Sequence, residues 1–166
     1  MITLILGGAR SGKSMVAERL ATRAGVDVTY VATVSVGEDA DLAERVAAHQ
    51  RRRPTHWVTI ECGTDLVGEL ERTPGTVLVD SLGPWLAAWP APGPDVEQLC
   101  AALVARADYT IIVSEEVGLG VHPSTTLGRE FRDALGELNQ AIASVASEVL
   151  LVIAGRVLPL QPGDIS

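Results

Sequence analysis

The chain has 166 residues, a length that fits one domain with a full sheet-and-helix core. Hydrophobic residues make up 47% of it and charged residues 20%, which is an ordinary composition for a soluble globular domain. Aromatic residues make up only 4%, so Val, Leu, Ile and Ala must build the core, as suits a parallel sheet buried on both faces. The net charge of −8 argues against a nucleic-acid partner, because such a partner favours a basic face.

In chain order, the first half of the sequence alternates short apolar runs with amphipathic stretches. Short apolar runs predict buried strands, and apolar residues three or four positions apart predict helices. Strands are predicted at residues 2–6, 26–33, 56–61 and 76–80, with helices between them at residues 14–24, 38–50 and 64–72. Thr64 is the expected N-cap of the third helix, because its hydroxyl can accept from the N–H groups of the first turn.

The second half continues this alternation. It predicts a short helix at residues 82–89, a proline-rich loop at 90–94, a helix at 95–107 capped by Asp95, a strand at 109–114, a loop at 115–126, a long helix at 127–147 and a last strand at 148–154. Strands that alternate with helices form a parallel sheet. We therefore expect an α/β fold of one domain over residues 1–166, with a mostly parallel central sheet and helices on both faces.

Three further features of the sequence indicate where in the cell the protein is located. No apolar run reaches about 18 residues, so no membrane span is predicted. A strand and a glycine-rich loop follow Met1 at once, so we expect no signal peptide. Cys62 and Cys100 lack the spacing of metal ligands, and we interpret them as small buried residues in a reducing compartment. Together these features predict a cytoplasmic protein.

The loop after the first predicted strand matches the phosphate-loop pattern G-x-x-x-x-G-K-[ST] at every fixed position. Its residues are Gly7, Gly8, Ala9, Arg10, Ser11, Gly12, Lys13 and Ser14. The glycines let backbone N–H groups point at phosphate oxygens, Lys13 reaches the β and γ phosphates, and the Ser14 hydroxyl ligates Mg²⁺. Because the match follows a strand and opens a helix, it predicts a site for a nucleoside triphosphate rather than an ordinary glycine-rich turn.

Asp80 ends the apolar run at residues 76–80. In P-loop proteins an acid at this point helps to hold Mg²⁺, usually through a water molecule. Its side chain could instead cap the helix that follows. The two roles are compatible.

His49 has two interpretations that the spacing of residues does not separate. It could be a histidine favoured by the dipole at a helix C-terminus, and Arg51, Arg52 and Arg53 would then follow the same preference. Alternatively, it is a nucleophile that attacks an α-phosphate, with the arginines neutralising the displaced charge. The loop that begins with Glu115 and Glu116 is similarly open: it could close over a substrate or be an ordinary acidic surface loop.

Six sequence motifs occur along the chain in the same order as in a known enzyme family. In sequence they are GGARSGKS, YVAT, ERVAAHQRRRPTHWVTIE, LVDSLGPWL, VSEEVGLGVHP and GREFRDALGELNQAIASVASEVLLVIAG. Together they resemble the bifunctional adenosylcobinamide kinase / adenosylcobinamide-phosphate guanylyltransferase family of cobalamin assembly, over about residues 2 to 155. The pattern R-x-x-x-H-x-x-R-R-P-x-x-W and the EVG-x-G-x-x-P loop are far more specific than the phosphate loop alone.

The resemblance implies a P-loop enzyme that uses GTP, ATP and Mg²⁺. Such an enzyme phosphorylates adenosylcobinamide and then transfers GMP from GTP to adenosylcobinamide phosphate through a guanylylated histidine, giving adenosylcobinamide-GDP. The family's histidine falls on His49, which joins Lys13 and Asp80 as expected catalytic residues, and Ser14 and Asp80 as expected Mg²⁺ ligands. Its nucleotide contacts fall on residues 7–14, Ala32, Thr33, Val34, Gln50, Arg51, Arg52, Arg53, Glu61 and Asp80.

The resemblance also implies a homo-oligomer, with a trimer as one candidate. Two other functions stay open at this point. A monofunctional P-loop small-molecule kinase would transfer phosphate and form no covalent nucleotide on the protein. A non-catalytic nucleotide-binding regulatory protein would turn over no GTP, although the intact set of Lys13, Ser14 and Asp80 argues against it.

Overall fold

The computed structural model describes residues 1–25, 27–33, 53–91 and 93–163. In this part of the chain, seven strands form one sheet in the order β3-β2-β4-β5-β1-β6-β7. The strands are β1 (Ile2–Gly7), β2 (Val28–Ala32), β3 (Val58–Glu61), β4 (Thr76–Asp80), β5 (Thr110–Glu115), β6 (Glu148–Ile153) and β7 (Arg156–Leu160). The helices are α1 (Lys13–Ala24), α3 (Leu66–Arg72), α4 (Leu82–Ala87), α5 (Val96–Ala105) and α6 (Thr126–Val145). The expected helix at residues 38–50 lies outside the described residues.

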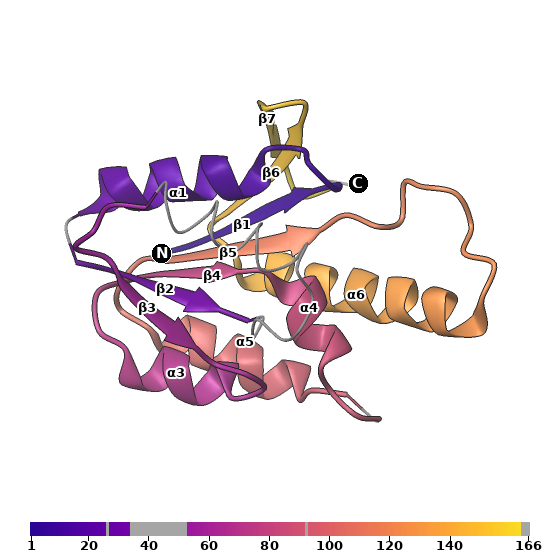
Figure 1. The fold of residues 1–166 in the computed structure, drawn as a ribbon, viewed down its shortest axis with the longest axis horizontal. Helices are drawn as coiled ribbons and strands as arrows, with labels where there is room; N and C mark the ends of the chain where they lie inside the picture. The colour runs from indigo at the N-terminus through magenta and orange to yellow at the C-terminus, as the bar shows by residue number, and fades with distance from the viewer. Residues whose placement is uncertain (26, 34–52, 92, 164–166) are drawn as a thin grey trace.

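Helices cover both faces of the sheet, as Figure 1 shows, with α1 above it and α3, α5 and α6 below it. Alternate residues of a strand point to opposite faces, so the central strand β1 contributes Leu4 to one apolar layer and Ile5 to the other. The first layer includes Leu103 of α5 and Leu135 of α6. The second includes Val16 and neighbouring residues of α1. The predicted α/β fold, a mostly parallel sheet with helices on both faces, is confirmed.

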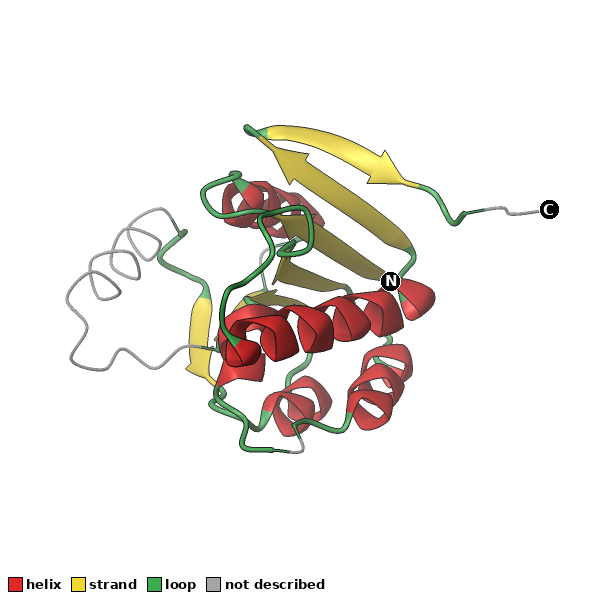
Figure 2. Cartoon of the chain, turned by 90° about the vertical axis from the view of Figure 1, so that its right-hand side faces the viewer, coloured by secondary structure: helices red, strands yellow, loops and turns green. Residues whose placement is uncertain are grey.

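The prediction that the strand at residues 148–154 is the last one was wrong. β6 is followed by β7, which pairs antiparallel with it and forms an edge of the sheet. The turn between them uses Ala154 and Gly155, whose φ angles of 50° and 72° suit a two-residue hairpin. Proline is rare in strands because it lacks the N–H group, but an edge strand such as β7 tolerates Pro159. Figure 2 shows this hairpin at one end of the sheet.

The helix caps agree with the sequence in one case and not in another. Asp95 caps α5, since its side chain accepts a hydrogen bond from the Gln98 amide at 2.9 Å. The predicted cap Thr64 was wrong, because the N-cap of α3 is Asp65, whose carboxylate accepts from the Gly68 amide. The two residues are adjacent and are both good caps, so only the backbone path distinguishes them.

Both cysteines lie in the part of the chain that the structure describes. Cys62 and Cys100 are both free thiols, the first buried and the second half-buried. Burial raises the pKa of Cys62 to about 11, so its thiol stays protonated at neutral pH. Among the helices of the described residues, none combines the length and apolar character that crossing a bilayer requires.

Candidate phosphate-binding site

The loop between β1 and α1 is closely packed around two glycines. A Cβ atom on Gly7 would lie 2.5 Å from Ser11 Oγ and 2.7 Å from the carbonyl oxygen of Val152. Gly12 has a φ of 95°, a left-handed conformation that strains other residues, and a Cβ there would lie 3.3 Å from Gly155 Cα. The Gly155 amide also donates to the Ser11 carbonyl at 2.8 Å. The β6–β7 turn therefore supports the loop from outside, a contact that the sequence did not predict.

We expect Gly7→Ala to destabilise the protein by about 1 to 3 kcal/mol, because the new methyl group meets a backbone oxygen that cannot move aside easily. Gly8→Ala is the matched control, since a Cβ on Gly8 would meet nothing within 4 Å. Urea unfolding of both variants measures the difference in the free energy of unfolding. Equal stabilities for the two variants would contradict the tight packing at Gly7.

The N-terminus of α1 is suited to an anion. Its N-cap is Gly12, and no side chain makes a capping hydrogen bond there in the described structure. The first N–H groups of a helix have no acceptor within the helix, and the helix dipole places partial positive charge beside them. The loop thus directs backbone donors toward the position where a phosphate would bind.

Lys13 is 9% exposed and lies at the first position of α1. Its Nζ donates to the Gly8 carbonyl at 3.3 Å and lies 3.5 Å from Oε1 of Glu115, the last residue of β5. Gly7 and Glu115 are neighbours in the β1–β5 register, which explains why the two segments meet. Glu115 therefore lies in the site. The sequence placed it at the start of a loop that could close over a substrate or be an ordinary acidic surface loop, and it gave no sign of the contact with Lys13.

Ser14 and Asp80 meet beside this lysine. Ser14 Oγ donates to Asp80 Oδ1 at 3.2 Å, and the Tyr30 hydroxyl donates to Asp80 Oδ2 at 2.8 Å. Burial, and then the negative charge of Asp80, raise the pKa of Tyr30, so its hydroxyl stays protonated and acts as the donor. The alternative role of Asp80 as the cap of the following helix is not seen, because the N-cap of α4 is the next residue, Ser81.

The oxygen atoms of Ser14 and Asp80 are suitable ligands for Mg²⁺. A hydroxyl oxygen and a carboxylate already lie within hydrogen-bond distance of each other, and Mg²⁺ takes oxygen ligands, of which proteins commonly supply one or two. Ser14 and Asp80 come from the start of α1 and the end of β4, two elements whose relative position the sheet fixes. Ser14 and Asp80, which the sequence predicted separately as Mg²⁺ ligands, thus lie next to each other; their binding of the ion stays a prediction.

The sheet brings other predicted contact residues to the same edge. Ala32 pairs with Glu61 on one side and Asp80 on the other, so the ends of β2, β3 and β4 lie in line. Thr33 follows β2, and its buried hydroxyl donates to the Ser81 carbonyl at 2.6 Å. In parallel sheets this carboxyl edge is where ligands bind. Five predicted site residues lie outside the described part of the chain: Val34, His49, Gln50, Arg51 and Arg52.

Arg53 is the one predicted arginine of this segment that the structure describes. Its guanidinium carbon lies 3.1 Å from the centroid of the Tyr30 ring, a cation–π contact. The same Tyr30 bonds Asp80, so one aromatic side chain joins the arginine segment to the candidate Mg²⁺ ligand. In the sequence Tyr30 stands within an apolar run and looks like an ordinary core residue, so nothing there indicated this role.

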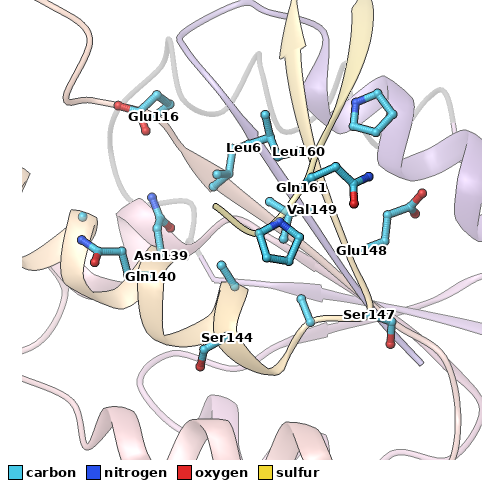
Figure 3. Close-up of a pocket in the computed structure, with 15 residues that line it drawn as sticks. Leu6, Glu116, Asn139, Gln140, Ser144, Ser147, Glu148, Val149, Leu160 and Gln161 are labelled. Atoms are coloured by element: carbon cyan, nitrogen blue, oxygen red, sulfur yellow. The ribbon is translucent and has the colours of Figure 1, made fainter. Parts of the chain in front are cut away.

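A groove of about 900 Å³ lies between α6, β6 and the segment after β7, with Glu116 and Asn139 at one end (Figure 3). Asn139 is buried, and its Nδ2 donates to the backbone carbonyl of Glu115 at 3.1 Å. The amide of Glu116 donates to the Gly7 carbonyl at 3.1 Å. These two contacts connect α6 to the phosphate-binding loop and fix the start of the loop after β5.

A phosphate loop at the carboxyl edge of a mostly parallel sheet defines the P-loop class of nucleotide-binding proteins. Solved structures support this fold. The flagellar accessory protein FlaH from Methanocaldococcus jannaschii has a TM-score of 0.52 at 14% identity, over 94% of this chain and 74% of that chain. The RadB recombinase has a TM-score of 0.51 at 17% identity, over 90% and 73%. At these identities the likeness shows the fold alone.

The chain belongs to the cobinamide kinase / cobinamide phosphate guanyltransferase family, whose model matches residues 3–160. It is 42% identical to the bifunctional adenosylcobalamin biosynthesis protein CobP of Pseudomonas aeruginosa, over 97% of this chain and 98% of the relative. It is 35% identical to the bifunctional adenosylcobalamin biosynthesis protein CobU of Salmonella typhimurium, over 93% and 97%. The resemblance predicted from the motifs is confirmed.

Proposed function

We propose that this chain catalyses two successive steps of cobalamin assembly. It phosphorylates the hydroxyl group on the aminopropanol arm of adenosylcobinamide with ATP or GTP, and it then transfers GMP from GTP to adenosylcobinamide phosphate, giving adenosylcobinamide-GDP. The membership of the family supports both activities. The observation that carries the proposal at the level of the site is the buried Lys13 on the phosphate loop, beside the bonded pair of Ser14 and Asp80.

The kinase step needs positioning and charge stabilisation more than covalent chemistry. The N–H groups of the loop and the first turn of α1 hold the phosphates, and Lys13 stabilises the negative charge that develops as the γ-phosphoryl group moves to the substrate hydroxyl. Ser14 and Asp80 would hold Mg²⁺, which when bound neutralises charge on the phosphate oxygens. The Tyr30 hydroxyl orients the Asp80 carboxylate for this role.

The guanylyl transfer proceeds through His49 in this proposal. A neutral imidazole nitrogen attacks the α-phosphorus of GTP, a P–N bond forms, and the P–O bond to pyrophosphate breaks. Lys13 and Arg51–Arg53 stabilise the charge of the departing pyrophosphate. An oxygen of adenosylcobinamide phosphate then attacks the same phosphorus, the P–N bond breaks, and His49 is released as a free imidazole. The product carries the GMP group on the substrate's phosphate.

Asp80→Asn should lower the Mg²⁺-dependent kcat/KM by about 10- to 100-fold, because it removes the charge expected to face the ion. Nucleotide affinity measured without Mg²⁺ should change much less, since the amide oxygen of the introduced asparagine can still accept from the Tyr30 hydroxyl and its Nδ2 can donate to the Ser14 hydroxyl oxygen. Titrating Mg²⁺ at fixed nucleotide concentration separates the two effects. Equal losses with and without the ion would instead assign Asp80 a structural role.

The function is tested directly by product analysis. The purified chain is incubated with adenosylcobinamide, Mg²⁺ and either ATP or GTP, and the corrinoid products are identified by mass spectrometry. We expect adenosylcobinamide phosphate with ATP alone, and adenosylcobinamide-GDP once GTP is added. A product that stops at the phosphate would support the monofunctional kinase. An unchanged corrinoid would support a nucleotide-binding protein without catalysis.

The proposal extends to the state of the protein in the cell. We expect a cytoplasmic homo-oligomer, with a trimer as the candidate that the family resemblance suggests. Light scattering coupled to size-exclusion chromatography measures the mass of the assembly, and a mass equal to one chain would contradict self-association.

A further inference from the structure

Glu115 is held in place by more groups than its ion pair with Lys13. Its Oε1 accepts a hydrogen bond from Ser81 Oγ at 2.8 Å, and its Oε2 accepts from the Gly83 amide at 2.9 Å. Its backbone carbonyl accepts from Asn139 at 3.1 Å. The carboxylate is therefore fixed against the first turn of α4, whether or not Lys13 contacts it.

The packing around this carboxylate leaves it little freedom to turn away. A Cβ atom on Gly83 would clash with Glu115 Oε2, so the helix approaches the carboxylate closely. The side chain of Glu115 is 25% exposed and that of Lys13 is 11% exposed. Charges shielded from water to this degree interact more strongly than surface charges.

Lys13 is the group that reaches the β and γ phosphates of a nucleotide in a phosphate loop. In this structure its Nζ lies 3.5 Å from a carboxylate oxygen instead. A triphosphate bound to the loop would place several negative charges near the fixed charge of Glu115. The phosphates must both attract Lys13 away from its partner and overcome repulsion from that partner.

We propose that Glu115 is a positioning residue that pairs with Lys13 as its counter-ion and opposes the binding of the β and γ phosphates. The carboxylate keeps the lysine ordered beside the loop, and its charge weakens nucleotide affinity in proportion to the number of phosphates near Lys13. This inference rests on the nucleotide site of the proposed function and adds to it a residue that sets the strength of binding.

The test is the variant Glu115→Gln, which keeps an oxygen for the Gly83 amide and removes the charge. We measure equilibrium binding, by calorimetry without corrinoid, of three guanine nucleotides: GMP, GDP and a GTP analogue with a methylene group between its α and β phosphorus atoms. This analogue cannot donate GMP to the protein. We expect the dissociation constant of the triphosphate to fall by about 5- to 30-fold, that of GDP to fall by less, and that of GMP to stay unchanged.

Two control comparisons separate charge from structure. Glu116→Gln removes the same charge from the next residue, whose carboxylate accepts from the Gly118 and Leu119 amides, so its nucleotide affinities should match the parent. Glu115→Asp and Glu115→Asn have equal shape and differ only in charge. The Asn variant should bind the triphosphate more tightly than the Asp variant, which keeps the test valid even where Gln is poorly tolerated.

The outcomes are distinct. Tighter binding that grows from GMP to the triphosphate supports the inference. Unchanged or weaker triphosphate binding in Glu115→Gln, or the same factor for all three nucleotides, would overturn it and leave Glu115 as a residue that only supports α4. A parent chain that binds none of these nucleotides would overturn the proposed function itself.

Discussion

Lys13→Ala should lower the turnover of both reactions by at least about 10²- to 10³-fold. Charge stabilisation is the main resource of phosphoryl transfer, and Lys13 is the cation that the phosphate loop aims at the transferred or departing phosphates. In the kinase step it stabilises the γ-phosphoryl group, and in the guanylyl step it stabilises pyrophosphate. Both rates should therefore fall together, as steady-state assays with adenosylcobinamide and with adenosylcobinamide phosphate would measure.

The fold should survive this substitution. Glu115 loses its ion pair but keeps its hydrogen bonds from Ser81 and Gly83, so its charge is still solvated by protein groups. Thermal melts without nucleotide should match those of the parent chain closely. Arg19→Ala is the control, because Arg19 is an exposed cation on the same helix and its loss should leave both rates unchanged. Activity near the parent level in Lys13→Ala would refute the assignment of the phosphate loop.

His49→Ala should abolish guanylyl transfer and the covalent attachment of GMP to the protein. The kinase step should continue at least in part, because phosphoryl transfer to the substrate hydroxyl needs no covalent intermediate on the protein. If His49→Ala abolished both the kinase step and guanylyl transfer, His49 would support the structure of the whole site and not act as the nucleophile alone. His56→Ala serves as the matched control, since His56 is an exposed histidine at the other end of the same arginine-rich stretch and should label normally.

The chemistry of the phosphoramidate gives a second readout. The label should be stable in base and lost in acid, because protonation of the nitrogen makes it a good leaving group. Attack needs the neutral imidazole, so labelling should fall as the pH decreases from about 8 to about 5, the range in which an ordinary histidine gains its proton. Labelling that rises toward acid, or a label that survives acid, would point to a different nucleophile.

The fold was predictable because its signals are local. The phosphate loop is one contiguous motif, and the alternation of apolar runs with helical periodicity predicts a parallel sheet without any knowledge of which strands are neighbours. β7 was not predicted because its five residues are all exposed and include Pro159. Its sequence also lacks the apolar–polar alternation that indicates a strand. The choice between Thr64 and Asp65 as a cap depended on a backbone path that neither side chain reveals.

The site was predictable where it follows the loop motif and less so where distant segments meet. Ser14 and Asp80 were predicted as Mg²⁺ ligands from the loop motif and from an acid at the end of a strand, and the structure places their side chains in contact. Tyr30 and Glu115 were not assigned because their roles arise from pairing across the sheet, which no local pattern encodes. β1 and β5 are neighbours in the sheet, but the sequence does not reveal the strand order, so it does not show that their carboxyl ends lie side by side.

In the proposed function, one chain both phosphorylates its substrate and carries GMP on a histidine. The most direct measurement incubates the parent chain with Mg²⁺ and GTP labelled with ³²P at either the α or the γ phosphate, without corrinoid, and counts the label that stays on the denatured protein. We expect acid-labile label from the α position and none from the γ position. If the chain phosphorylates adenosylcobinamide but retains no α label, the guanylylated histidine is excluded and the chain is a kinase alone.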